Sequence, residues 1–295
     1  MTNTSVRKAV IAIDGGGTRC RVAYVAADLC EVVEGGASNA CSNFDGTVQS
    51  INAALQELGQ RLAMPVSELH STPAYAGLAG VIDKTIESKL HKTLPFNQLK
   101  IEDDRHCAVR AALGMNDGIL CHCGTGSFFA LQSHNAVRYA GGWGPVLGDT
   151  ASAYWLGTRA LSLTLNTVDG LFESTPLAEH FLDVLEGTSG IVNFAALATP
   201  AEIGALAESV SEYAASQDAL AVRALTEGAS LIADTLVALG WTKNLPICLA
   251  GGVGTHYQDY LPKELQACIA SPKGEPIDGA IALAQAFLQE LQHEG

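Results

Sequence analysis

Three short glycine-rich clusters interrupt this sequence, and each follows a run of residues that is typical of a buried strand. The clusters are Asp14-Gly-Gly-Gly-Thr18, Gly124-Thr-Gly-Ser127 and Ala250-Gly-Gly-Val253. Glycine lets the backbone turn tightly and leaves N–H groups free, so such turns can cradle phosphate oxygens or let a flat base lie close. One such turn is also common in ordinary hairpins. Three in this order favour a nucleotide site.

The composition limits the partners of such a site. The 295-residue chain is 48% hydrophobic, which is enough for one large domain or two lobes with separate cores. A formal net charge of -14, without any basic run, argues against nucleic acid as a partner. No segment approaches the roughly 18 consecutive apolar residues of a membrane helix. We therefore expect a cytoplasmic protein without a membrane partner.

The order of the predicted elements indicates an α/β protein in two parts. Three strands open the chain, strands then alternate with helices as far as the helix Arg105–Leu113, and a new set of strands begins at Gly118. The segment from Asp149 to Gly240 is rich in Ala, Leu, Glu and Ser and predicts a helical insertion. We predict an N-terminal lobe over residues 1–117, a C-terminal lobe over 118–295 and a final amphipathic helix over about 277–292.

The three clusters resemble motifs of the actin-like ATPase superfamily of sugar kinases. Within it, they resemble the N-acetylglucosamine kinase and BadF/BadG/BcrA/BcrD ATPase group. The segment Gly141-Gly-Trp-Gly144, followed by Leu147-Gly-Asp149, resembles the signature that sets this group apart. The resemblance covers essentially the whole chain. It implies a two-lobed actin-like (ribonuclease H-like) fold with a nucleotide and sugar cleft between the lobes, and a last helix that packs back on the first lobe.

The resemblance assigns the clusters to the nucleotide. It implies two phosphate motifs and an adenosine motif, and Asp14, at a strand end, is placed to hold Mg²⁺ through water. The candidate nucleotide-binding residues are Asp14, Gly15, Gly16, Gly17, Thr18, Gly124, Thr125, Gly126, Ser127, Gly251, Gly252 and Val253.

Asp104 is the candidate catalytic base. A carboxylate within hydrogen-bond reach of a sugar hydroxyl can orient it and accept its proton during attack on the γ-phosphorus. Asp104 follows a predicted strand that ends near Ile101 and precedes an alanine-rich helix, as the catalytic aspartate does in the family that the chain resembles. Asp103 is the neighbouring competitor, and either residue could instead cap the helix.

The candidate sugar ligands lie in several segments. Amide and carboxylate groups can fix a polyol by paired hydrogen bonds. Asn39 could instead make a local turn, and Asp149 could instead begin the following helix. Besides Asp104, the residues that the resemblance implies are Asn39, Ala79, Gly80, Gly142, Trp143, Gly144 and Asp149.

The activity implied by the resemblance is ATP-dependent phosphorylation of an amino sugar. The first candidate is N-acetylglucosamine, phosphorylated at its C6 hydroxyl with Mg²⁺ by a homodimer. Glucosamine is the alternative, because Thr150 stands where members of the family carry an acidic residue.

Two further functions compete with the kinase. Iron–sulfur activator ATPases of the same superfamily place a cluster-binding cysteine near the offset of Cys121, although no second cluster cysteine is evident after Gly126. A sugar sensor without catalysis is less favoured because Asp14, Asp104 and both phosphate loops are retained. The thiols of Cys121 and Cys123, interpreted as pointing to opposite faces of a strand, are more typical of a core than of a structural zinc site, which needs four ligands.

Overall fold

The computed structural model describes residues 9–134 and 136–294, which divide into two compact units. The first unit comprises residues 1–114 and 273–295, and the second comprises residues 115–272. Lys8, which the sequence places at the start of the first strand, lies outside the described residues with the rest of segment 1–8. The boundary that the sequence predicts between an N-terminal lobe (1–117) and a C-terminal lobe (118–295) remains a proposal.

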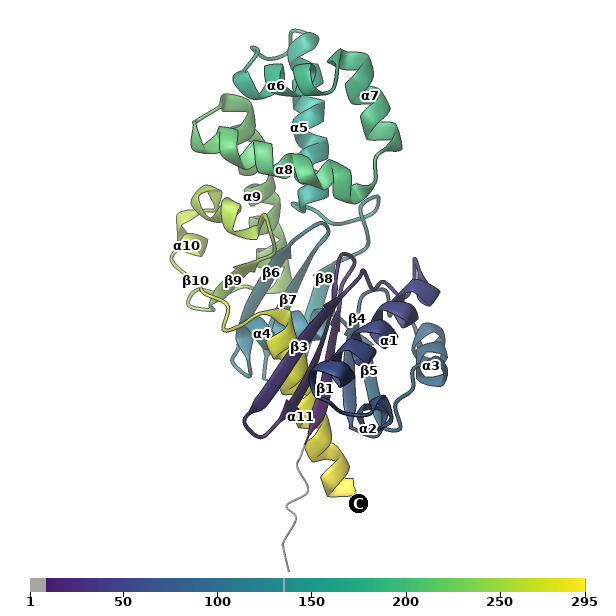
Figure 1. The fold of residues 1–295 in the computed structure, drawn as a ribbon. Helices are drawn as coiled ribbons and strands as arrows, with labels where there is room; N and C mark the ends of the chain where they lie inside the picture. Colours follow the sequence, from purple (N-terminus) through teal and green to yellow (C-terminus); the bar gives the residue numbers. More distant parts are fainter. Residues whose placement is uncertain (1–8, 135, 295) are drawn as a thin grey trace, which may run out of the picture. The chain divides into compact units, whose positions relative to one another are not determined.

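The first unit is built on a five-stranded sheet of order β3-β2-β1-β4-β5 (Figure 1). The three strands β1 to β3 pair antiparallel, whereas β1, β4 and β5 run parallel. Because parallel strands end at the same edge of a sheet, the residues that follow β1, β4 and β5 meet there. The bounds are β1 Val10–Gly15, β2 Cys20–Ala26, β3 Leu29–Gly35, β4 Ala74–Leu78 and β5 Leu99–Asp103.

Both faces of this sheet are covered, as the alternation along β1 requires. Ile11 and Ile13 belong to a core that includes residues of α1, α2 and α3. Val10 and Ala12 belong to a second core, to which α4 and α11 contribute. The bounds are α1 Phe44–Arg61, α2 Val66–His70, α3 Lys84–Thr93, α4 Arg105–Leu113 and α11 Pro276–Glu294.

The last helix therefore completes the first unit. α11 packs along α4 and β1, and Gly279 lies directly against the α4 backbone, where an added Cβ would overlap the carbonyl oxygen of Cys107. Lys273, just ahead of α11, donates through Nζ to the carbonyl of Leu113 at 2.8 Å and so satisfies a free carbonyl at the end of α4.

The second unit carries a sheet of order β10-β9-β6-β7-β8 with a helical layer (Figure 1). β6 and β9 are parallel neighbours, so their carboxyl ends also meet. The strands are β6 Gly118–Cys123, β7 Ser127–Ser133, β8 Ala136–Gly141, β9 Ile247–Ala250 and β10 Ile269–Ala270. The helices are α5 Ala153–Val168, α6 Pro176–Val184, α7 Gly187–Leu197, α8 Pro200–Ala215, α9 Ala219–Leu239, the 3-10 helix η1 Gly254–Tyr260 and α10 Lys263–Gln266.

Some predicted element bounds need correction. The apolar spacing between Phe44 and Met64 predicts one helix over that whole range, but α1 ends at Arg61, because Ala63 adopts a left-handed backbone with φ of 50°. β5 continues past Ile101 to Asp103 and so carries Asp103 to the edge of the sheet. Among the described residues, no helix is both long and apolar enough to cross a membrane.

The close approach of α11 to α4 predicts a stability effect. We expect Gly279→Ala to lower the free energy of unfolding by about 1–3 kcal/mol, because the added methyl group must push the two helix backbones apart. Urea unfolding measures the loss. The matched control is Gln285→Ala, which changes an exposed position of the same helix; equal stability of the two variants would contradict this account.

Candidate active site

The candidate carboxylates Asp14 and Asp104 lie on either side of Gly77, at the carboxyl end of the parallel strands of the first sheet. The register pairs Asp14 with Gly77 and Gly77 with Glu102, and Asp104 follows β5 directly. An added Cβ on Gly77 would lie 3.5 Å from the Cα of Asp104 and would overlap the Cys107 thiol. Burial raises the pKa of Asp104, and the negative charges of Asp103 and Asp14 add to this effect.

Asp14 is held by a nearly buried arginine on the neighbouring strand. Arg21, its cross-strand partner, donates from Nε at 3.2 Å and from Nη2 at 2.8 Å to the same oxygen, Oδ2. The third contact of this guanidinium runs from Nη1 to Oε2 of Glu275 at 2.5 Å. Burial raises the pKa of Asp14, while the arginine acts in the opposite direction.

The first glycine loop presents free backbone donors. Its carbonyls face inward: Gly15 accepts from the Ala79 N–H at 2.7 Å, and Gly16 accepts from the Ser38 N–H at 2.9 Å. Gly17 and Thr18 are exposed, and within the described residues no hydrogen bond uses their N–H groups. A Cβ on Gly17 would meet nothing within 4 Å. The loop therefore offers amides and open space to an anion.

The structure distinguishes the roles of Asp103 and Asp104. Asp103 Oδ1 accepts from the backbone N–H of Arg105 at 3.0 Å and from its Nε at 2.6 Å. Asp104 occupies the N-cap position of α4, but its side chain makes no capping hydrogen bond. Burial, together with the charges of Asp103 and Asp14, raises the pKa of Asp104 to about 7. Arg105 therefore engages the carboxylate of Asp103, which leaves the carboxylate of Asp104 available to a ligand.

Asn39 lies beside the two residues that were proposed with it for the sugar. It forms an isolated parallel bridge with Ala79, and its Oδ1 would overlap a Cβ added to Gly80. The same Oδ1 accepts from the N–H groups of Cys41 at 3.1 Å and Ser42 at 3.0 Å, so the local turn is present. The side-chain NH₂ group of Asn39 is its remaining polar group for a ligand hydroxyl.

The second glycine loop is anchored through its carbonyls and its serine. The carbonyls of Gly124 and Thr125 accept from the first N–H groups of α5, those of Ala153 at 2.8 Å and Tyr154 at 3.4 Å. The Ser127 hydroxyl donates to the carbonyl of Thr150 at 2.7 Å. The hydroxyl of Ser127 therefore stabilises the loop, whereas the hydroxyl of exposed Thr125 is accessible to a ligand.

Asp149 is buried against this second loop instead of beginning a helix. Its carboxylate accepts backbone hydrogen bonds from Ser127 and Gly144, and an added Cβ on Gly126 would lie 2.7 Å from its Oδ2. The helix α5 is capped by Ser152, which accepts from the Trp155 N–H. Asp149 thus joins the predicted signature segment to the second glycine loop.

The signature segment before Asp149 is open and apolar. Gly142 and Gly144 both have left-handed backbones, with φ of 75° and 84°. Trp143 is 76% exposed, and its neighbours Val146 and Leu147 are exposed as well. An apolar ring beside flexible backbone can pack against the face of a sugar.

The third cluster packs directly on the second. A Cβ on Gly251, which has φ of 82°, would overlap the backbone of Cys123 and lie 2.7 Å from the Gly124 nitrogen. Val253 donates its N–H to the Cys123 carbonyl at 3.0 Å. Around Gly252, by contrast, an added Cβ would meet nothing within 4 Å. The carboxyl ends of β6 and β9 therefore form a continuous glycine surface with open space above it.

The thiols of Cys121 and Cys123 belong to a core, as expected, but the expectation that they point to opposite faces of the strand is wrong. Cys121 and Cys123 are two residues apart on β6, so they point to the same face, and their sulfurs lie 3.7 Å apart in a buried core. His122, between them, points to the other face and stacks on Phe128 with a centroid distance of 5.2 Å. Burial lowers the pKa of His122 to about 4, which keeps the imidazole neutral near pH 7.

The described residues hold no cluster of three or more His, Cys, Asp or Glu side chains suited to a metal ion. A magnesium ion that is bound mainly by phosphate oxygens and water needs only one or two carboxylates. Asp14 fits this requirement, because only its Oδ2 is engaged by Arg21 and its side chain is still 12% exposed.

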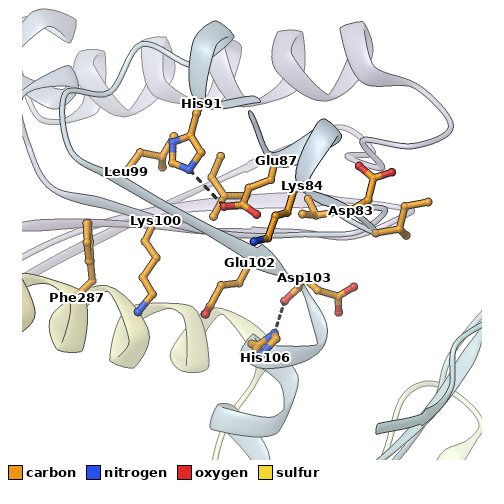
Figure 2. A pocket seen from close by; sticks show the side chains of 13 residues that line it. Asp83, Lys84, Glu87, His91, Leu99, Lys100, Glu102, Asp103, His106 and Phe287 are labelled. Atoms are coloured by element: carbon orange, nitrogen blue, oxygen red, sulfur yellow. Dashed lines mark hydrogen bonds and ion pairs between the residues drawn. The ribbon is translucent and has the colours of Figure 1, made fainter. Parts of the chain in front are cut away.

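A groove of about 540 Å³ runs along β5 at the edge of the first sheet (Figure 2). Asp103 and His106 line it, but Asp104 does not. Several of its charged groups already have partners: Lys100 pairs with Glu290 at 3.0 Å, and His91 approaches Glu87 at 3.9 Å. Asp103 therefore faces this groove, whereas Asp14 and Asp104 do not line it.

Comparison with known proteins identifies the family. Residues 11–284 match the BadF/BadG/BcrA/BcrD ATPase family. The chain belongs to this family. The predicted resemblance, the α/β class and the two-lobed actin-like fold are thereby confirmed, as is the use of ATP that the family implies.

Three relatives indicate the activities found among similar proteins. The glucosamine kinase GspK of Vibrio cholerae is 25% identical and covers 97% of this chain and 98% of its own. The N-acetylmuramic acid/N-acetylglucosamine kinase of Clostridium acetobutylicum is 27% identical, with 95% and 99% covered. The crystal structure of a candidate N-acetylglucosamine kinase from Chromobacterium violaceum has a TM-score of 0.83 at 30% identity, with 97% and 100% covered.

Sequence reasoning missed Arg21 and Glu275. Arg21 carries a signal, because its place on the strand after the loop makes it the cross-strand neighbour of Asp14. Glu275 carries none, since it lies 254 residues away from Arg21 in the chain.

The contrast between Gly251 and Gly252 predicts a matched pair of effects. We expect Gly251→Ala to lower the free energy of unfolding by about 1–3 kcal/mol, because its backbone is left-handed and an added methyl group overlaps Cys123. Gly252→Ala should leave stability nearly unchanged, since its Cβ enters open space. Denaturant unfolding of both variants checks this, and similar losses in the two would refute the packing described for the cluster.

Proposed function

We propose that this protein is an ATP-dependent amino-sugar kinase that transfers the γ-phosphoryl group to a sugar hydroxyl. The preferred acceptor is the C6 hydroxyl of N-acetylglucosamine, and the product is N-acetylglucosamine 6-phosphate. The observation that carries the proposal is the meeting of Asp14 and Asp104 across Gly77, beside a loop with free backbone donors.

Asp104 is the proposed base in this reaction. Its carboxylate is free of a capping role, and a pKa of about 7 suits a group that must take a proton near neutral pH. Asn39, Ala79 and Gly80 supply a short polar floor in the same unit, on which a sugar hydroxyl can be oriented.

The phosphate groups are proposed to bind the free N–H groups of the glycine loops. Gly17, Thr18, Thr125 and Gly126 are the donors, and Gly252 leaves room for the adenosine. Asp14 would hold Mg²⁺ through water, and the ion would neutralise charge on the transferred phosphoryl group. The proposed sugar contacts of the second unit are Gly142, Trp143, Gly144 and Asp149. Asp149 contributes by holding the backbone N–H groups of Ser127 and Gly144.

Glucosamine is the second candidate acceptor. A kinase named for this sugar aligns with nearly the whole chain, and Thr150 supplies no carboxylate at the position discussed for the sugar. An iron–sulfur activator is disfavoured, because Cys121 lies in the hydrophobic core, where its hydrogen bond with Cys123 and its burial raise the pKa of its thiol. A homodimer and a cytoplasmic location complete the proposal.

The acceptor is tested by a panel of sugars. We expect N-acetylglucosamine to stimulate ADP release from magnesium-ATP more than glucosamine, glucose or N-acetylmannosamine, with phosphate at C6 of the product. A coupled ADP assay and NMR of the product measure both. Stronger stimulation by glucosamine would identify glucosamine as the preferred acceptor. No stimulation by any sugar, together with iron in anaerobically purified protein, would favour the iron–sulfur activator over the kinase.

The base is tested by substitution and pH together. We expect Asp104→Asn to lower turnover by about 10²–10⁴-fold, the span of general acid–base catalysis. A base must be deprotonated, so turnover of the native enzyme should rise with pH through about 7, and this step should vanish in the variant. Asp103→Asn is the matched control: it should keep turnover near neutral pH and keep the pH step, but at a lower pH, because one of the charges that raise the pKa of Asp104 is removed. Unchanged turnover in Asp104→Asn would exclude Asp104 as the base.

A further inference from the structure

The guanidinium of Arg21 lies between two carboxylates that come from opposite ends of the chain. Its Nε and Nη2 converge on Oδ2 of Asp14, and its Nη1 is bound to Oε2 of Glu275. The Arg21 side chain is only 8% exposed, whereas that of Glu275 is 69% exposed. One arginine thus connects the first phosphate loop to the residue that precedes α11.

Within the described part of the chain, this arrangement leaves one oxygen of Asp14 without a hydrogen-bond partner. Arginine and carboxylate often pair through two parallel hydrogen bonds, one to each oxygen. Here both donors reach the same oxygen, and no hydrogen bond within the described residues reaches Oδ1. An unpaired carboxylate oxygen can accept from a water in the shell of a magnesium ion.

The position of Glu275 is set by contacts on both sides of it. Its backbone N–H donates to Oδ2 of Asp278 in the first turn of α11 at 2.8 Å. Lys273, two residues earlier, donates its own N–H to the Ala112 carbonyl at 3.1 Å and its ammonium to the Leu113 carbonyl. The carboxylate that receives Nη1 is therefore tied to α11 and, through the chain, to the end of α4.

We propose that Glu275 is a positioning residue of the magnesium site: by holding Nη1 of Arg21, it keeps the guanidinium on one oxygen of Asp14 and leaves Oδ1 to the hydrated ion. The inference rests on the proposed function, in which Asp14 binds Mg²⁺ through water. Without Glu275, a nearly buried donor loses its acceptor. The guanidinium can then pair with both oxygens of Asp14 and occupy Oδ1, which would otherwise accept from the water shell of the ion.

The test measures how strongly Mg²⁺ enhances nucleotide binding, without turnover. Calorimetric titration with a non-hydrolysable ATP analogue gives dissociation constants with and without Mg²⁺, and their ratio is the magnesium enhancement. We expect Glu275→Ala to reduce this ratio about 10-fold, as loss of outer-shell partners of metal ligands does. Glu275→Gln, which keeps an acceptor oxygen without the charge, should lose less.

Glu290→Ala is the matched control. It removes another exposed glutamate of α11, one that pairs with Lys100 at 3.0 Å on the groove side of the sheet, and it should keep the native ratio. A native ratio in folded Glu275→Ala would overturn the role of Glu275 and leave the kinase proposal standing. If Glu275→Ala unfolds, Glu275→Met takes its place, because it also removes both acceptor oxygens while keeping the length of the side chain, and a native ratio there overturns the role of Glu275 equally. The absence of any magnesium enhancement in the native protein would overturn the proposed metal site itself, and this inference with it.

Discussion

The parallel pairing of β1, β4 and β5 is the constraint on which the first half of the site depends. Three strands that end at one edge bring Asp14 and Asp104 together, although 90 positions separate them in the numbering. Gly77 is the necessary gap between them, because any side chain there would overlap Cys107. The raised pKa of Asp104 follows from the same crowding, since burial and two nearby carboxylates all disfavour its charge.

Local sequence patterns predicted most of the elements because each pattern reports a local cause. The bounds of α4 agree with the predicted helix Arg105–Leu113, since Gly114 marks where the segment stops. The three glycine clusters were located from sequence for the same reason. The mistakes arose where the cause was not local to the pattern, as with Ala63, whose left-handed backbone ends α1 before Met64.

Partnerships between distant side chains could not be predicted in this way. Asp149 was assigned from its motif, yet its carboxylate is engaged by the N–H groups of Ser127 and Gly144, which only the folded chain brings to it. Likewise, nothing in the local sequence of Glu275 indicates Arg21. The choice between Asp103 and Asp104 depended on Arg105 occupying the first of them, a contact that the sequence permits but does not require.

The return of α11 into the first unit has a consequence for synthesis on the ribosome. Ile277, Ala280 and Ala284 fill a core together with Val10, Ala12 and Tyr75, so this core lacks one wall until the last residues leave the exit tunnel. The second unit is continuous in sequence and has all of its strands earlier. During translation the second unit can therefore reach its folded state first, while β1 and β4 wait for α11.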